Sequence, residues 1–199
     1  MSLKEITKDL HHDAETTKFA KLLLSGKIDK EDYANYLYQM VLIYNIIELG
    51  NRVEGNFTKL PGLERTHEIY QDFIEIAGVD HKYKWLPGTL EYYNYLLDLV
   101  RDPQQRPKIK AHLYCRHMGD LYGGQIIKKQ VAHISKGRFY DFKNPEELKV
   151  SIRSELTDDL GDEARVAFEW AIKMMKELYN EPSLEYIDSN TDTTGREFQ

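Results

Sequence analysis

The segment best suited to chemistry is residues 114–125, where three glycines interrupt a pattern that otherwise predicts one long helix. Gly119 and Gly123 are four residues apart, so they lie on one face of that helix. Each glycine inside a helix costs about 1 kcal/mol relative to alanine, which indicates a compensating use. A helix face without side chains lets a large, flat ligand lie close to the backbone. Arg116 and Asp120 form a second series beside it, so a carboxylate adjoins this candidate binding surface.

A second candidate lies near the N-terminus, where a histidine follows two lysines at helical spacing. Lys4, Lys8, His11 and Glu15 occupy positions i, i+4, i+7 and i+11, which share one helix face. An imidazole can bind iron while ammonium groups pair with acidic groups of the same ligand, and haem offers both through its iron and its propionates. The alternative is an ordinary solvated face that includes a histidine. His12 points about 100° away from His11, so only one of them can face the ligand.

Three further patterns each have a plain structural alternative. Lys149 and Arg153 form an i, i+4 cationic pair, which is either an exposed face or a partner for propionates. Cys115 could be a nucleophile, although most lone helical cysteines are buried and inert. Glu64 and His67 have the Glu-x-x-His spacing of di-iron bundles, but those sites need a second such motif, which the sequence lacks.

The composition excludes several classes of protein. The formal net charge of -6 argues against a nucleic-acid footprint, and a single cysteine allows no intramolecular disulfide. The N-terminus has no apolar stretch typical of a signal peptide, and no apolar run is long enough to span a membrane. We therefore expect a soluble, cytoplasmic protein. The 14 tyrosines could line an apolar cavity and still offer hydroxyls to a water network.

Nearly every hydrophobic pattern has helical period, and no Asn-Gly or Asp-Gly hairpin turn occurs between alternating segments. The sequence predicts an all-α single domain of about eight helices over residues 1–180, followed by a polar tail over residues 181–199. Asp29 and Asn144 are predicted N-caps. His112 shares the glycine face and could line the entrance of a pocket there. The predicted helices span residues 2–16, 18–24, 30–54, 63–76, 89–100, 107–133, 145–158 and 162–179.

Residues 3–180 resemble the haem oxygenase family, and two motifs carry the resemblance. Residues 4–15 look like the proximal helix of the family, and residues 114–129 look like its distal helix. The run Gly-Asp-Leu-x-Gly-Gly-Gln inside a helix is the more specific of the two. The resemblance implies a multi-helical bundle in which haem is sandwiched between these helices. The short, acidic chain looks more like cyanobacterial, algal or phage-carried members than membrane-tethered animal enzymes.

The resemblance also implies a role for each matching residue. His11 would be the proximal iron ligand, and Glu15 would engage its other ring nitrogen and so fix its orientation. Gly119 and Gly123 would let the distal helix lie on the haem face, and Asp120 would hold a water network near the bound oxygen. Contacts to the propionates or the polar haem edge would come from Lys4, Lys8, Tyr114, Lys149 and Arg153. Positions that line the pocket or the water network are matched by Tyr44, Arg116 and Phe168.

Two residues depart from the family pattern and leave the detail of the distal pocket open. Tyr122 stands where the family usually has a serine, and His117 stands where a tyrosine is common. Tyr122 could either narrow the pocket or point away from it.

The reaction of the family converts haem b, O2 and reducing equivalents into biliverdin, ferrous iron and carbon monoxide, so haem is both cofactor and substrate. By analogy the product is the IX-alpha isomer, the electron donor is ferredoxin, and a bilin reductase acts downstream. The purpose could be bilin pigment synthesis, iron recovery or both.

Three other functions stay open at this point. A thiaminase-like hydrolase would use Cys115 and bind no haem. A haem carrier or sensor would bind haem without degrading it. A di-iron oxidase would hold two metal ions between its helices.

Overall fold

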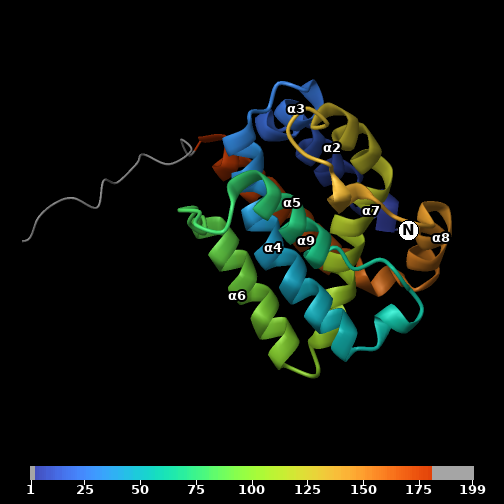
Figure 1. Cartoon of the computed structure of the whole chain (residues 1–199). Coiled ribbons are helices and arrows are strands. Elements are labelled where there is room, and N and C mark those ends of the chain that lie inside the picture. Colours follow the sequence, from blue (N-terminus) through green and yellow to red (C-terminus); the bar gives the residue numbers. More distant parts are fainter. Residues whose placement is uncertain (1–2, 181–199) are drawn as a thin grey trace, which may run out of the picture.

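Helix α4, Lys30–Val53, is the central element of the structure, a computed structural model that describes residues 3–180 (Figure 1). It packs against α5, Thr66–Ala77, and α6, Pro87–Arg101, and also contacts α7, Ile109–Gln130. Apolar side chains cover most of its circumference, as expected for a helix surrounded by others. Its fully buried side chains include Tyr33, Leu37, Met40, Ile43, Tyr44 and Ile47.

The other helices enclose this centre. The remaining α-helices are α1, Leu3–Ile6; α2, Lys8–Thr16; α3, Lys18–Ser25; α8, Pro145–Ser154; and α9, Gly161–Asn180. Short 3-10 helices are η1, Asn56–Thr58; η2, Arg106–Lys108; η3, Arg138–Tyr140; and η4, Asp158–Leu160. The predicted all-α fold is confirmed over residues 3–180, where no strand occurs. The predicted tail, residues 181–199, lies outside the described residues.

The prediction of one continuous N-terminal helix is wrong, because the chain turns at Thr7 between α1 and α2. The Thr7 hydroxyl donates to the Leu3 carbonyl oxygen at 2.8 Å, a local bond that competes with regular helix geometry. Arg165 of α9 donates to the Ile6 carbonyl oxygen at 2.7 Å and forms two further bonds to the Asp9 carboxylate. Lys4 therefore lies on a separate helix. Helical spacing does not place it on the face that Lys8, His11 and Glu15 share.

Several other predicted helix ends also differ from the structure by a few residues, including those of α6, Pro87–Arg101, and α7, Ile109–Gln130. Helix α5 begins at Thr66, three residues after the predicted start. Helix α8 ends at Ser154, so the segment up to Asp158 is a connection and a short 3-10 turn. All of these differences lie at helix ends, where sequence signals are weakest.

The two predicted N-caps have different outcomes. An Asp29 carboxylate oxygen accepts a hydrogen bond from the Asp32 backbone N–H at 2.8 Å, so this cap is confirmed. Asn144 precedes α8 as predicted, but its side chain makes no capping hydrogen bond. Pro145 at the first position instead supplies a backbone already restricted to helical φ.

This contrast gives a direct stability test. We expect Asp29→Ala to lower the free energy of unfolding by about 1 kcal/mol, because a backbone donor at the start of α4 loses its partner. Asn144→Ala is the matched control and should leave the value nearly unchanged. Urea unfolding followed by circular dichroism measures both, and equal losses in the two variants would contradict the assignment of the caps.

Candidate functional site

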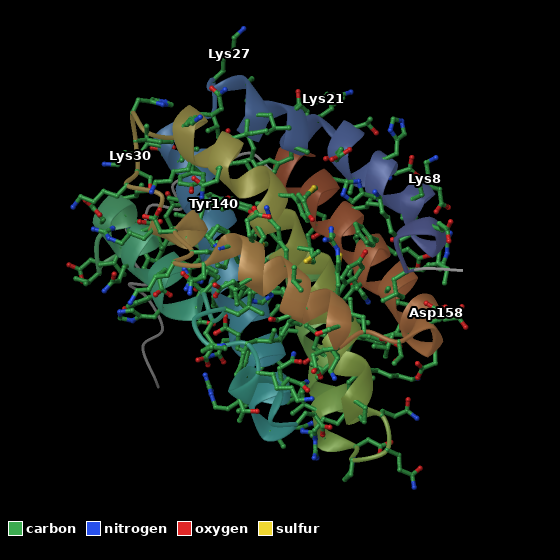
Figure 2. The ribbon with its side chains drawn as sticks, turned by 90° about the vertical axis from the view of Figure 1, so that its right-hand side faces the viewer. Lys8, Lys21, Lys27, Lys30, Tyr140 and Asp158 are labelled. Atoms are coloured by element: carbon green, nitrogen blue, oxygen red, sulfur yellow. The ribbon has the colours of Figure 1, made fainter. Side chains whose placement is uncertain are left out.

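Helices α2 and α7, which carry the two candidate motifs, both pack against α9 (Figure 2). A small apolar cluster joins the three helices. It contains Ala14 of α2, Cys115 of α7, and Ala167, Phe168 and Ile172 of α9. The alanines let the helices approach closely, and the buried Phe168 ring packs beside the His11 ring. The fold thus brings together two segments that are about one hundred residues apart in sequence.

His11 lies on the open side of this cluster, with 54% of its side chain exposed. Its Nδ1 atom is 3.5 Å from a Glu15 carboxylate oxygen, and its ring centroid is 5.7 Å from that of Phe168. Among residues 3–180 nothing bonds to its Nε2 atom. A carboxylate at Nδ1 favours the tautomer that leaves Nε2 as a free ligand atom, so His11 has the arrangement of a metal-binding histidine.

The glycines of α7 serve two different purposes. A Cβ atom added at Gly119 or Gly123 would meet no atom within 4 Å, so these positions face open space. A Cβ atom added at Gly124 would come within 2.5 Å of the Tyr140 ring, which packs directly on the helix backbone (Figure 2). The first pair therefore forms a bare strip for a ligand, and Gly124 allows close packing of the protein itself.

Asp120 lies beside this strip and is buried. The Tyr44 hydroxyl donates to its Oδ2 atom at 2.5 Å. Burial raises the pKa of Asp120 to about 6, while the positive charge at His117, the Tyr44 hydrogen bond and the charge of Arg116 oppose that rise. A carboxyl group that titrates near neutral pH can both accept and release a proton under ordinary conditions.

Arg116 is buried one turn before Asp120, but the two side chains form no ion pair in the described structure. The Arg116 Nη2 atom is 3.4 Å from the sulfur of Met174, and its guanidinium lies 5.5 Å from the centre of the Tyr92 ring. Arg116 therefore acts on Asp120 through its charge, from the side of α6 and α9.

The cations of α8 gather around Tyr122 of α7. Arg153 donates a hydrogen bond to the Tyr122 hydroxyl, and the Lys149 Nζ atom lies 4.4 Å from the centre of its ring. Lys149 also pairs with Glu146 at 2.6 Å. Tyr122 is half exposed and turned toward α8, so it does not fill the space above the bare strip. Its ring instead holds the two cations beside α7.

The other predicted contact residues lie around the same region. Tyr114 is half-buried and packs against the cluster that includes Phe168 and against a second apolar cluster, which consists of Leu3, Ala111, Leu160 and Ala164. Lys4 is exposed. Lys8 is also exposed and points outward (Figure 2). It lines a shallow hollow together with His12 and Arg165.

Two expectations for α7 are settled by burial. His112 does not line a pocket entrance: it is fully buried, with Nδ1 2.8 Å from the Tyr92 hydroxyl and Nε2 2.9 Å from a Glu163 carboxylate oxygen. That expectation was wrong, because Tyr92 of α6 and Glu163 of α9 cover this end of α7 and bury His112. Burial raises the pKa of Cys115 to about 12, so its thiol is not ionised at neutral pH. This disfavours the thiol-enzyme alternative.

The di-iron alternative also lacks a site. Glu64 is paired with Arg52, and the His67 Nε2 atom is 2.8 Å from the Gln71 amide. Over residues 3–180, no three histidine, cysteine or carboxylate side chains are grouped so that they could hold a metal ion. No helix in the same range has the length and apolar character needed to cross a membrane.

The sequence did not reveal the partner of His117. This histidine is fully buried, and its Nε2 atom is 3.7 Å from a carboxylate oxygen of Glu48 on α4. The available signal was Glu48 itself, an acidic residue one turn after Tyr44 within an otherwise apolar stripe. A pair so distant in sequence becomes visible only in the folded chain.

Comparison with known proteins agrees with this arrangement. A family model with the description "Heme oxygenase" matches residues 1–177. The chain is 30% identical to a heme oxygenase of Porphyra purpurea, over 88% of this chain and 84% of that protein. It is 26% identical to one of Rhodella violacea, over 89% and 86%. The structure of heme oxygenase-1 from Synechocystis in complex with heme is similar, with a TM-score of 0.77, 25% identity, and coverage of 88% and 90%.

The different uses of the glycines can be separated by stability. We expect Gly124→Ala to lower the free energy of unfolding by about 1–3 kcal/mol, because the new methyl group collides with the Tyr140 ring. Gly119→Ala should instead raise it by up to about 1 kcal/mol, since alanine favours the helix and meets open space. Urea unfolding of the haem-free protein measures both. Destabilisation of the same size in both variants would mean that Gly119 also packs against protein.

Proposed function

The chain belongs to the haem oxygenase family, and we propose that it converts haem b, with O2 and reducing equivalents, into biliverdin, ferrous iron and carbon monoxide. The observation that carries this proposal is that His11 and the bare strip at Gly119 and Gly123 lie on two helices packed against the same helix, α9. The first offers a ligand atom for iron, and the second offers a flat surface for a macrocycle.

The residues around His11 and the bare strip fit haem in both shape and chemistry. A neutral imidazole with a free Nε2 atom suits a single axial bond, and Glu15 holds the opposite nitrogen. The Phe168 ring provides apolar surface between the helices. No side chain projects from the two glycines, so a planar ligand can contact the backbone of α7.

The cations around the site would orient the ring. Lys149 and Arg153 are already gathered beside α7 by Tyr122, and both can pair with carboxylates. Lys4, Lys8 and the Tyr114 hydroxyl supply further candidate contacts to propionates. Contacts that fix ring rotation also determine which bridging carbon faces the oxygen, and by family resemblance we assign the IX-alpha isomer.

On the distal side, Asp120 would hold and release protons, and Tyr44 would position it. Haem supplies the iron and the carbon that is oxidised, so the protein contributes position, water and protons. The Asp120 carboxyl, with its pKa near 6, can hold or release a proton through an ordered water molecule. Tyr44 fixes one of its oxygens and so leaves the other for water.

The resemblance to photosynthetic members extends the proposal to partners. We propose ferredoxin as electron donor, a bilin reductase as the next enzyme, and pigment synthesis in the cytoplasm as the setting. Exposed lysines support an acidic donor, because opposite charges speed encounter even when net charge is negative. Lys8 and Lys21 extend outward from neighbouring helices (Figure 2).

The direct test is an absorption spectrum of the protein with added hemin, followed after reduced ferredoxin or ascorbate is supplied in air. We expect a Soret band that decays into the broad absorption of biliverdin, with release of carbon monoxide. A stable Soret band would favour the carrier or sensor alternative. The absence of a Soret band would contradict haem binding altogether.

The two adjacent histidines provide a matched pair. We expect His11→Ala to lose the spectrum of histidine-ligated haem, because the free Nε2 atom of the ring beside Phe168 is removed. His12→Ala should keep that spectrum, since His12 lines the outer hollow. Glu15→Ala should weaken haem affinity by about 10-fold to 100-fold. Loss of the spectrum in His12→Ala alone would reverse the assignment.

Asp120 can be tested by both product yield and stability. We expect Asp120→Asn to bind haem but to form biliverdin about 10²-fold more slowly, because its amide cannot exchange a proton. Folding raises the pKa of Asp120 to about 6, so wild-type stability falls as the pH rises from about 4 through that value. Asparagine does not titrate, so the stability of the variant relative to wild type should increase across this range. A constant difference would contradict the raised pKa.

A further inference from the structure

His117 is a fully buried histidine at a position where haem oxygenases commonly have tyrosine. It lies on α7, one turn before Asp120, and its ring centroid is 5.1 Å from that of Tyr44. Tyr44 in turn donates its hydroxyl proton to Asp120. A titratable imidazole therefore adjoins the hydrogen bond that we assign to the distal side of the site.

Both ring nitrogens of His117 face groups that can only accept hydrogen bonds. Its Nδ1 atom is 3.2 Å from the Leu113 carbonyl oxygen, whereas its Nε2 atom is buried without a hydrogen-bond partner and points to Oε1 of Glu48 at 3.7 Å, an ion-pair distance. A neutral imidazole carries one N–H group and could serve only one of these acceptors. The imidazolium carries two and can serve both.

Glu48 is equipped to remain a carboxylate. Burial alone would raise its pKa, but hydrogen bonds and the charge of His117 outweigh burial and lower it. The Glu48 Oε1 atom accepts from the backbone N–H groups of Arg65 and Thr66 at 2.5 and 3.1 Å, and Oε2 accepts from the Thr66 hydroxyl at 2.6 Å. An ionised acceptor with no proton of its own is therefore directed at His117.

His112, on the same helix and equally buried, shows the opposite arrangement. Its Nε2 atom faces a Glu163 carboxylate, but its Nδ1 atom faces the Tyr92 hydroxyl, which can donate. A neutral imidazole satisfies both partners there, and burial lowers the pKa of His112. The nature of the second partner, rather than burial, distinguishes the two histidines.

We propose that His117 is a buried imidazolium, held by Glu48, whose charge positions Asp120 in its ionised form. The charged groups around His117 and Asp120 come from three segments. Glu48 and Tyr44 face His117 from α4, Arg116 and Asp120 are near it on α7, and Arg65, just before α5, acts on Asp120 through its charge. His117 supplies the largest of the electrostatic contributions that oppose the effect of burial on Asp120. It is a positioning residue, since it acts on Asp120 and not on the ligand.

The charge state of His117 does not depend on haem, although its consequence for turnover rests on the proposed function. Removal of the charge should leave Asp120 protonated at neutral pH. A protonated Asp120 cannot accept a proton from water, so the pH profile of turnover should move with the Asp120 titration.

The first experiment uses the haem-free protein labelled with ¹⁵N at histidine. At about pH 7.5, one unit above the usual histidine value, long-range ¹H–¹⁵N spectra should show two protonated nitrogens for His117. His112 should show one, which makes it an internal control in the same spectrum. A single protonated nitrogen on His117 would overturn the proposal without reference to haem or to activity.

The second experiment follows the Asp120 carboxyl by ¹³C NMR in the same haem-free protein, with Asp120→Asn to assign the signal. We expect His117→Tyr to raise the titration midpoint by about one pH unit or more. His133→Tyr, at an exposed histidine, is the control and should not move it. An unchanged midpoint in His117→Tyr would remove the positioning role. If this variant does not fold, His117→Gln serves instead. Failure of haem turnover in the wild type would contradict only the proposed function.

Discussion

The site depends on the packing of α2 and α7 against one shared support, α9. Small side chains, Ala14 and Ala167, set how closely the helices approach, and Phe168 packs with them in one cluster beside His11. Because protein interiors are densely packed, the separation of the motifs changes little once these contacts form. The common function that we propose for the open face at Gly119 and the free nitrogen of His11 depends on this support. Arg165, which ties α9 to Ile6 and Asp9, fixes the same helix that carries His11.

The second feature on which the site depends is a group of buried charged side chains. Asp120, Arg116, His117 and Glu48 all lie in the interior, where an unpaired charge is costly and a paired one is strongly felt by its neighbours. Hydrogen bonds to tyrosine, threonine and backbone groups position Asp120, Glu48 and His117, whereas Arg116 contacts the Met174 sulfur. In the proposed site, this arrangement sets which of the buried side chains around Asp120 carry a proton before any ligand binds. It also explains why the exposed and buried histidines of one chain can have different chemistry.

Much of the fold could be predicted, because helical periodicity, glycine spacing and Asp29 are local signals. The bare strip at Gly119 and Gly123 was predictable for the same reason. The break at Thr7 was not, since it depends on Arg165 from the far end of the chain. The orientation of Tyr122, the burial of His112 and the pairing of His117 with Glu48 likewise arise from contacts between distant segments. Spacing within one helix cannot show which neighbour each face will meet.

The most direct measurement is a crystal structure of the protein with haem. The account predicts haem between α2 and α7, with its iron bonded to the Nε2 atom of His11 and one face against the backbone at Gly119 and Gly123. The α8 cations Lys149 and Arg153 should then lie at the propionate edge. Iron bonded to His12, or haem seated in the outer hollow beside Arg165, would contradict the central claim.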